Sequence, residues 1–335
     1  MNKFVFKIGL LNVLLWLTSC AQDDLIPANK TTMRLYSEGF KAATSSLDDK
    51  AVLLFWELEK FSNIEQNRPF LVAQPTNAIN AYNTTPYDTH TLYPPKDNIV
   101  AAVGYGPQDL ISSQTAGTND YITLSLPSSK NGATTDLFTA VEPIYGSTSN
   151  PFDKAGRTPL RFMHAQSKIT FKALRQADMN LGIRNIRISF GKEVISGSLI
   201  WNQKQERYIT QAGEKEYTLA QEDTQTPLGQ TEPTVIGSLF VCAGLTEIPV
   251  TVTVEKSDDD FKKNIQTTMF TKTLPFEITR TAEEIGKEAN RLYAGEAYTF
   301  TLRFDKSTLV LIGKKEPWVD GEKITIPIYP TPNTP

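Results

Sequence analysis

The sequence predicts an all-β protein made of two tandem antiparallel β-sandwich domains with one or two short helices. Many short segments alternate apolar and polar residues, which is the pattern of a strand with one buried face. The segments Val250–Val254 and Phe300–Phe304 show this alternation most clearly. Gly, Pro, Asn, Asp and Ser separate the segments, as is typical of the turns in a sandwich.

Three further segments alternate in the same way, namely Ile122–Leu126, Ile169–Ala173 and Ile186–Phe190. Signals for helices are few. The apolar run Leu53–Phe61 is compatible with a short helix. Thr281 and Glu284 form a capping box, which predicts a second helix over Ile285–Leu292.

The length of the chain allows two domains of about 100 to 200 residues each. Small and turn-forming residues gather between Ser147 and Gly156, and strand-rich segments lie on both sides. We therefore expect one sandwich over residues 34–150 and the other over residues 158–335.

The N-terminus carries the features of a secretory signal. Lys3 and Lys7 precede an apolar run, Ile8–Ser19, of 12 residues. Spanning a bilayer takes about 20 predominantly apolar residues, so this run is too short for a membrane helix. Residues 1–19 are therefore expected to be removed as a signal peptide.

Cys20 follows Leu17 and two small residues, which is the pattern of bacterial lipoprotein signals. This pattern predicts that the Cys20 thiol is acylated and begins the mature chain, with residues 20–33 as a lipidated linker leading into the first strand. The alternative is an ordinary signal peptide with a chance cysteine.

The composition argues against nucleic acid as a partner and against a disulfide bond within the mature chain. The formal net charge is −3 and no cluster of Lys and Arg is present, so nucleic acid is not expected as a partner. If Cys20 carries lipid, Cys242 has no cysteine left to pair with. Cys242 lies in an apolar segment, which favours a small buried hydrophobe over a reactive thiol.

The motifs of common enzymes and metal sites are missing, so we expect no catalytic residues, no metal and no cofactor. His90 and His164 are far apart in sequence, and a structural histidine is the better interpretation of His164. The run Asp258–Asp260 lacks the spacing of a calcium loop and predicts a hairpin turn. A secreted enzyme would need carboxylates that only folding brings together, as in glycosidases.

Trp56, Trp201 and Trp318 leave a different class of function open. On an exposed surface they could stack on sugars, which would make the protein an outer-membrane lipoprotein that binds glycans or other ligands without polymerising. Each tryptophan is isolated in the sequence and neighbours a predicted strand or helix. Packing in the core or at an edge is therefore the favoured interpretation.

Three motifs in the expected order resemble those of Bacteroidales fimbrillins, the subunits of type V pili. The segment Phe162–Phe171 is similar to the F-x-H-A-x-S-K motif that opens their second domain. Asp136–Ala140 resembles the segment that closes their first domain, and Pro317–Gly321 resembles a motif near their C-terminus. With the lipoprotein signal at Cys20, the resemblance extends over the whole mature chain.

The resemblance implies two transthyretin-like domains and a lipid-anchored precursor in the outer membrane. A surface protease would remove the first strand, and the groove left behind would accept the C-terminal strand of the next subunit. The expected partners are therefore other pilus subunits, a processing protease and the outer membrane. Such strand addition satisfies the unpaired N–H and C=O groups of a sheet edge.

The candidate donor segment covers residues 308–335. Ile324, Ile326 and Ile328 alternate with other residues and would point one way into a slot. Burying each is worth roughly 1.5 to 3 kcal/mol before ordering costs. Pro327 lacks an N–H and restricts the segment to an edge or an inserted position. The alternative, that this strand closes its own domain, is equally supported.

The candidate first strand is Thr31–Ser37, with Met33 and Leu35 on one face. Processed fimbrillins are cut at an arginine just after this strand, whereas the matching position here is Lys41. Arg34 lies inside the strand, where folded backbone resists cleavage. An arginine-specific protease would therefore leave the chain whole, which favours either an uncut anchor or a subunit processed by a different protease. For the second case we expect processing after Lys41.

Overall fold

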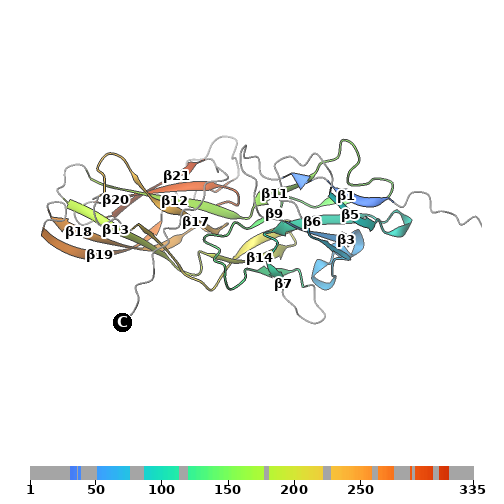
Figure 1. Cartoon of the computed structure of the whole chain (residues 1–335), viewed down its shortest axis with the longest axis horizontal. Helices are drawn as coiled ribbons and strands as arrows, with labels where there is room; N and C mark the ends of the chain where they lie inside the picture. Colours follow the sequence, from blue (N-terminus) through green and yellow to red (C-terminus); the bar gives the residue numbers. More distant parts are fainter. Residues whose placement is uncertain are drawn as a thin grey trace, which may run out of the picture.

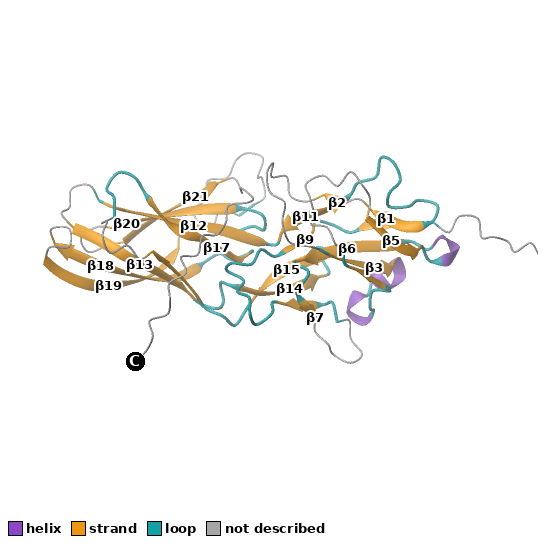
Figure 2. Cartoon of the chain, in the orientation of Figure 1, coloured by secondary structure: helices purple, strands orange, loops and turns teal. Residues whose placement is uncertain are grey.

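The computed structural model describes residues 31–35, 37–38, 51–75, 87–112, 120–176, 181–221, 228–258, 263–274, 287–288, 291–304 and 309–316. The described chain is mostly β and forms an elongated molecule with two groups of sheets along its length (Figure 1). Helices are short and lie at one end (Figure 2). Within the described residues, no helix has the length and apolar character needed to span a membrane.

The first group contains the N-terminal strands and one later hairpin. Its strands are β1 (Thr32–Leu35), β2 (Ser37–Glu38), β3 (Val52–Glu57), β4 (Leu71–Ala73), β5 (Tyr87–Leu92), β6 (Val100–Gly106), β7 (Ile111–Ser112), β8 (Thr123–Ser125), β9 (Phe138–Ala140), β10 (Ile144–Gly146), β11 (Leu160–His164), β14 (Ser196–Asn202) and β15 (Arg207–Ala212). The short helices are α2 (Leu58–Phe61), η1 (Ile64–Gln66) and η2 (Pro95–Asp97).

The second group is built from the remaining strands. These are β12 (Gln166–Arg175), β13 (Leu181–Phe190), β16 (Tyr217–Gln221), β17 (Thr234–Cys242), β18 (Ile248–Asp258), β19 (Lys263–Leu274), β20 (Ala297–Phe304) and β21 (Leu309–Glu316).

The first group has three layers, and its middle layer is a seven-stranded sheet in the order β2-β11-β9-β6-β3-β4, with β10 paired to β6. Strands β3 and β6 are buried on both faces. Leu53 and Phe55 of β3 enter one apolar cluster, whereas Leu54 and Trp56 enter the cluster on the opposite face. The pair β1–β5 covers the first face, and the sheet β7-β8-β14-β15 covers the second.

The predicted helix over Leu53–Phe61 is wrong in its first half. Val52–Glu57 forms strand β3, and only Leu58–Phe61 is helical. A continuous apolar run fits a strand buried on both faces as well as a buried helix, so the sequence period could not separate the two. Only the covering layers on both faces of the sheet decide in favour of the strand.

The second predicted helix is also wrong where it can be checked. Of the range Ile285–Leu292, the structure describes residues 287–288 and 291–292, and none of them is helical. Instead, the main chain here makes two hydrogen bonds to the loop after β17, Gly244 N to Leu292 O (2.8 Å) and Leu292 N to Leu245 O (2.9 Å). Tertiary contacts outweigh the local capping signal.

The second group is a sandwich of two four-stranded sheets, β17-β12-β20-β21 and β16-β13-β18-β19. Both sheets contribute alternate residues to one apolar cluster, in which Phe171 stacks on Phe300 at 5.9 Å and contacts Phe190 at 5.6 Å. The predicted strands at Ile169–Ala173, Ile186–Phe190, Val250–Val254 and Phe300–Phe304 are confirmed. Their apolar residues are the buried ones, as the alternation predicts.

The sheets are mainly but not wholly antiparallel, which corrects the prediction. Strand β12 pairs parallel with β20 over eight residues, from Lys168↔Ala297 to Arg175↔Phe304. Strand β2 pairs parallel with β11. Alternation gives the buried face of a strand but not the direction of its neighbour, so the sequence could not distinguish the two arrangements.

Strand pairing does not follow the predicted division between residues 34–150 and 158–335. Strand β11 lies in the seven-stranded sheet, and the chain passes into the second group after Ala165. The hairpin β14–β15 then returns to the first group, where β14 pairs with β8. Leu199, Trp201 and Tyr208 of this hairpin fill the cluster that contains Trp56.

We expect alkaline conditions to destabilise the first group partly through Tyr93. Its hydroxyl accepts a hydrogen bond from the Phe152 N–H at 2.7 Å. Burial raises the Tyr93 pKa to about 12, although the hydrogen bond from Phe152 acts in the opposite direction. The unfolded chain loses this proton near pH 10, so the stabilising contribution is complete below pH 10 and is lost between about pH 10 and 12.

The measurement is the free energy of unfolding against pH in wild type and in Tyr93→Phe. The variant lacks the ionisable group, so its stability should fall less steeply above pH 10, although it starts lower because the Phe152 N–H loses its acceptor. Identical slopes in the two proteins would contradict this role for Tyr93.

Candidate functional site

The first strand, β1, is the candidate functional element that the structure describes. Met33 and Leu35 are fully buried, whereas Arg34 between them is exposed. The predicted strand over Thr31–Ser37 is confirmed for Thr32–Leu35, with Met33 and Leu35 on one face, whereas Ser37 belongs to the separate strand β2. Strand β1 therefore fills part of the apolar core with two side chains, leaves Arg34 exposed and half-buries Thr32.

Main-chain pairing holds β1 on one side. It pairs antiparallel with β5, with Arg34 opposite Asp88 and Leu35 opposite Tyr87. Arg34 Nε lies 3.4 Å from an Asp88 carboxylate oxygen, in a solvent-exposed ion pair. Among the described strands, β5 is the only one that pairs with β1. This strand is thus attached through one edge and two buried side chains.

The surface beneath β1 is apolar and aromatic. The buried cluster that includes Met33 and Leu35 is formed by these side chains together with Ala51, Leu53, Phe55, Ala73, Tyr93, Val100, Ala102, Phe138, Ala140, Phe152, Leu160 and Phe162. Removing β1 from an otherwise unchanged core would take two of its apolar side chains out of this cluster. Each of the two β1 side chains contributes roughly 1.5 to 3 kcal/mol of burial energy.

The other predicted site residues lie outside the described part of the chain. These are the lipidation residue Cys20, the processing residue Lys41 and the donor residues Ile324, Ile326 and Ile328. Within the predicted C-terminal segment 308–335, the structure describes β21, Leu309–Glu316. Arg34 is described, and it lies in a paired strand as expected.

The two central motifs of the resemblance meet in the structure and join the two groups of sheets. Strand β9 pairs antiparallel with β11, with Phe162 opposite Ala140, and the rings of Phe138 and Phe162 meet edge to face at 5.8 Å. Gln166, the first residue of β12, is tied to the segment before β9. Its side-chain carbonyl accepts from the Leu137 N–H at 2.8 Å, and its amide donates to the Gly132 carbonyl at 2.9 Å. These motif residues therefore form a packed joint.

His164 belongs to this joint and is structural, as predicted. Its Nδ1 pairs with a side-chain carboxylate, whereas the expected partner of a structural histidine was nearby backbone. Its Nδ1 lies 2.8 Å from an Asp136 oxygen, and both side chains are largely buried. His90, in contrast, is on the surface in β5, with its side chain 88% exposed. No group of three or more His, Cys, Asp or Glu suited to a metal ion occurs within the described ranges.

Cys242 is buried, which confirms the structural interpretation. Its Sγ lies 3.4 Å from Ser196 Oγ. Burial raises the pKa of the thiol, against smaller effects of hydrogen bonds from Ser196 and Thr210. The nucleophilic thiolate is therefore disfavoured at neutral pH.

Asp258 lies at the end of β18, which pairs antiparallel with β19, so the predicted hairpin is confirmed. Residues 259–262, which contain the rest of the acidic run, are outside the described part of the chain.

Trp56 and Trp201 are buried in the first group and do not form an exposed platform for sugars. Both rings contact Phe61, at 5.7 and 5.6 Å, and Trp201 also packs on Tyr208 at 5.2 Å. Trp318 lies outside the described residues. Packing is therefore the role of the two tryptophans that can be placed.

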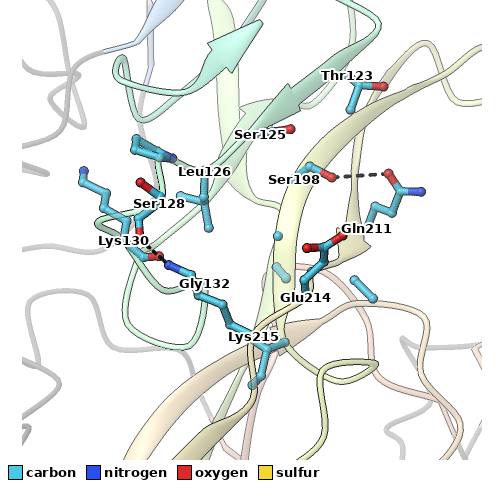
Figure 3. A pocket seen from close by; sticks show the side chains of 16 residues that line it. Thr123, Ser125, Leu126, Ser128, Lys130, Gly132, Ser198, Gln211, Glu214 and Lys215 are labelled. Carbon is cyan, nitrogen blue, oxygen red and sulfur yellow. Dashed lines mark hydrogen bonds between the residues drawn. The ribbon is translucent and has the colours of Figure 1, made fainter. Parts of the chain in front are cut away.

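A cavity of about 470 Å³ opens beside β8, β14 and β15. Figure 3 shows that hydroxyl groups of Thr123, Ser125 and Ser198 line it together with Gln211. Ser198 donates to the Gln211 side chain at 3.3 Å. Sequence analysis missed this cavity because β8 and β14 come together only by tertiary pairing.

Both lysines at this cavity are engaged, and Glu214 is the carboxylate among its lining residues. Lys215 Nζ donates to the carbonyls of Ser128 and Lys130, and Lys130 Nζ lies 2.6 Å from Asp109. No histidine or cysteine lines the cavity. The arrangement offers hydroxyl and amide groups together with the Glu214 carboxylate.

No protein-family model matches the sequence, and no curated protein matches it. Solved structures do match. A protein from Parabacteroides distasonis assigned to cell adhesion is 12% identical, with a TM-score of 0.53, and the match covers 84% of this chain and 90% of that protein. A fimbrial protein from Bacteroides vulgatus is 9% identical, with a TM-score of 0.50, over 85% of this chain and 99% of that one.

At these identities the matches establish the fold and nothing more. They extend over most of both chains, so the likeness concerns the whole arrangement of sheets and not one sandwich. The resemblance inferred from the motifs is thereby confirmed at the level of the fold. The chain has the fimbrillin-like fold of Bacteroidales fimbrial and cell-adhesion proteins.

Proposed function

We propose that this chain is a structural subunit, or a tip or anchor protein, of a lipoprotein-derived surface pilus, and that it supports adhesion. The observation that carries the proposal is β1, an N-terminal strand that fills the core with Met33 and Leu35 and pairs only with β5 among the described strands. A strand attached in this way can be exchanged for another extended segment with alternating apolar side chains.

In the proposed assembly, two tandem transthyretin-like domains polymerise by donor-strand exchange. Proteolysis after Lys41 would cut the chain behind both β1 and β2, so the released segment would give up the pairing of β1 with β5 and the short pairing of β2 with β11. The C-terminal segment of a neighbouring copy, with Ile324, Ile326 and Ile328 on one face, would then occupy the vacated slot. The exchange replaces the main-chain hydrogen bonds of β1 with those of the incoming strand, so the edge of β5 stays paired.

The proposed location is the cell surface, with the outer membrane as the point of attachment. Acylation of Cys20 would hold the precursor there until a protease releases it. Its partners would be other pilus subunits and that protease. The activity would be polymerisation and adhesion and would involve no catalysis by this chain.

The test is trimming of the full chain with a lysine-specific protease, followed by electrophoresis in SDS without boiling. We expect cleavage after Lys41 and a ladder of SDS-resistant oligomers. The substitution Lys41→Gln should prevent both. Deletion of the residues from Lys323 onward should leave cleavage intact and abolish the ladder.

An arginine-specific protease provides the matched comparison. Arg34 is held in the β1–β5 pair, so this protease should not release β1 from the folded chain. Trimming after Lys41 that yields only monomers would contradict donor-strand exchange, and so would a ladder that survives the C-terminal deletion.

A further inference from the structure

A second cavity, of about 190 Å³, lies where the two groups of sheets meet. Thr139 of β9, Met163 of β11 and Arg207 of β15 line one side. Gly244, just after β17, and the segment 291–294 before β20 line the other. Ligand sites occur preferentially at such junctions. Sequence analysis gave no sign of this cavity, because its walls come from five separate segments.

Arg207 is the principal charged group of the cavity, and its guanidinium has no carboxylate partner among the described residues. Its Nε donates to the Gln205 side-chain oxygen at 3.0 Å, and one terminal nitrogen donates to the sulfur of Met163 at 3.0 Å. A thioether is a weak acceptor. Burial lowers the pKa of Arg207, and no neighbouring anion compensates.

Arg291 adds a second positive charge to the same lining. Its Nε lies 3.5 Å from a Glu288 oxygen, with both side chains substantially exposed, so this pair is weak. Glu206 is adjacent to Arg207 in sequence, but its carboxylate accepts a hydrogen bond from the Tyr145 hydroxyl. Two arginines and no Asp or Glu are among the lining residues.

We propose that this cavity binds one carboxylate or sulfate group, carried by an acidic sugar residue. A planar guanidinium recognises such oxyanions through paired hydrogen bonds, which are stronger than a bond to sulfur. The incoming anion would therefore displace the Met163 sulfur as the acceptor for Arg207.

The size and the walls of the cavity set the kind of ligand. Its volume lies below the roughly 300 to 1,000 Å³ of pockets for drug-sized molecules, so it suits one small group and not a long chain. Met163, Leu292 and Tyr293 add apolar surface beside the arginines. That combination suits a ring that carries the anion better than a fully hydrated ion. This binding requires neither polymerisation nor strand exchange.

The experiment is calorimetric titration of the full chain, in detergent, with D-glucuronate and D-glucose 6-sulfate. Neutral D-glucose, sodium acetate and sodium sulfate serve as comparison probes. We expect saturable binding of the acidic sugars, no binding of glucose, and a loss of at least ~10-fold in affinity in Arg207→Gln, because a hydrogen bond to a charged group is lost. If acetate or sulfate binds as tightly as the acidic sugars, the oxyanion site is supported. Its ligand is then a free anion, and the assignment to an acidic sugar is wrong.

Arg161→Gln is the matched control, since Arg161 is exposed and pairs with Glu142 at 2.9 Å away from the cavity. It should bind like wild type. If Arg207→Gln does not fold, Arg291→Gln takes its place, because the Arg291 side chain is 43% exposed. No saturable binding of any acidic probe, or equal affinity in the folded arginine variant and in wild type, would overturn the proposal.

Discussion

Replacing Trp56 by alanine is expected to lower the free energy of unfolding by about 3 to 5 kcal/mol, the range for large aromatic residues in cores. The Trp56 side chain is completely buried between the seven-stranded sheet and the β14–β15 hairpin. Its Nε1 also donates to the Asn67 carbonyl at 3.2 Å. The substitution therefore leaves a cavity and removes a hydrogen bond. Chemical denaturation followed by far-UV circular dichroism measures the change.

Leu58→Ala is the control for this measurement. Leu58 follows two residues later, at the start of α2, but it is 38% exposed. We expect a change within about 0.5 kcal/mol, as for most surface substitutions. A small effect of Trp56→Ala, similar to that of Leu58→Ala, would contradict the description of this cluster as the core that joins β3 to the returning hairpin.

Replacing Leu35 by aspartate is expected to detach β1 from the first group and to cost at least ~3 kcal/mol, since a leucine burial is lost and a charge enters an apolar cluster. The second sandwich should stay folded because its core contains no β1 residue. Detachment opens the backbone around Arg34. An arginine-specific protease should therefore cut the variant at Arg34 rapidly, while wild type resists.

Arg34→Gln gives the baseline on the same strand. Arg34 is exposed and its ion pair with Asp88 is at the surface, so stability should change by no more than about 1 kcal/mol. Mass spectrometry of the proteolytic fragments distinguishes the variants. Equal resistance of Leu35→Asp and wild type to cleavage at Arg34 would show that the buried face of β1 does not hold the strand in place.

The sequence by itself determined the strands that bury one face and show alternation. In Phe300–Phe304 and Val250–Val254 the buried residues are those that the alternation selects. The same holds for β1, in which Met33 and Leu35 are buried and Arg34 is exposed. These predictions succeed because a period of two depends only on the geometry of a single strand. The motifs also marked two segments, Asp136–Ala140 and Phe162–Phe171, although only the structure shows that they meet where β9 pairs with β11.

The tertiary structure alone decided which strands become neighbours. Val52–Glu57 resembles a helix in sequence, and it is a strand because layers cover both of its faces. The parallel pairing of β12 with β20, the return of β14–β15 to β8, and the placement of Arg207 and Arg291 in the lining of one cavity all bring together segments that are distant in the chain. Such contacts depend on loop closure and on the shape of the whole core, and no local pattern of residues encodes either one.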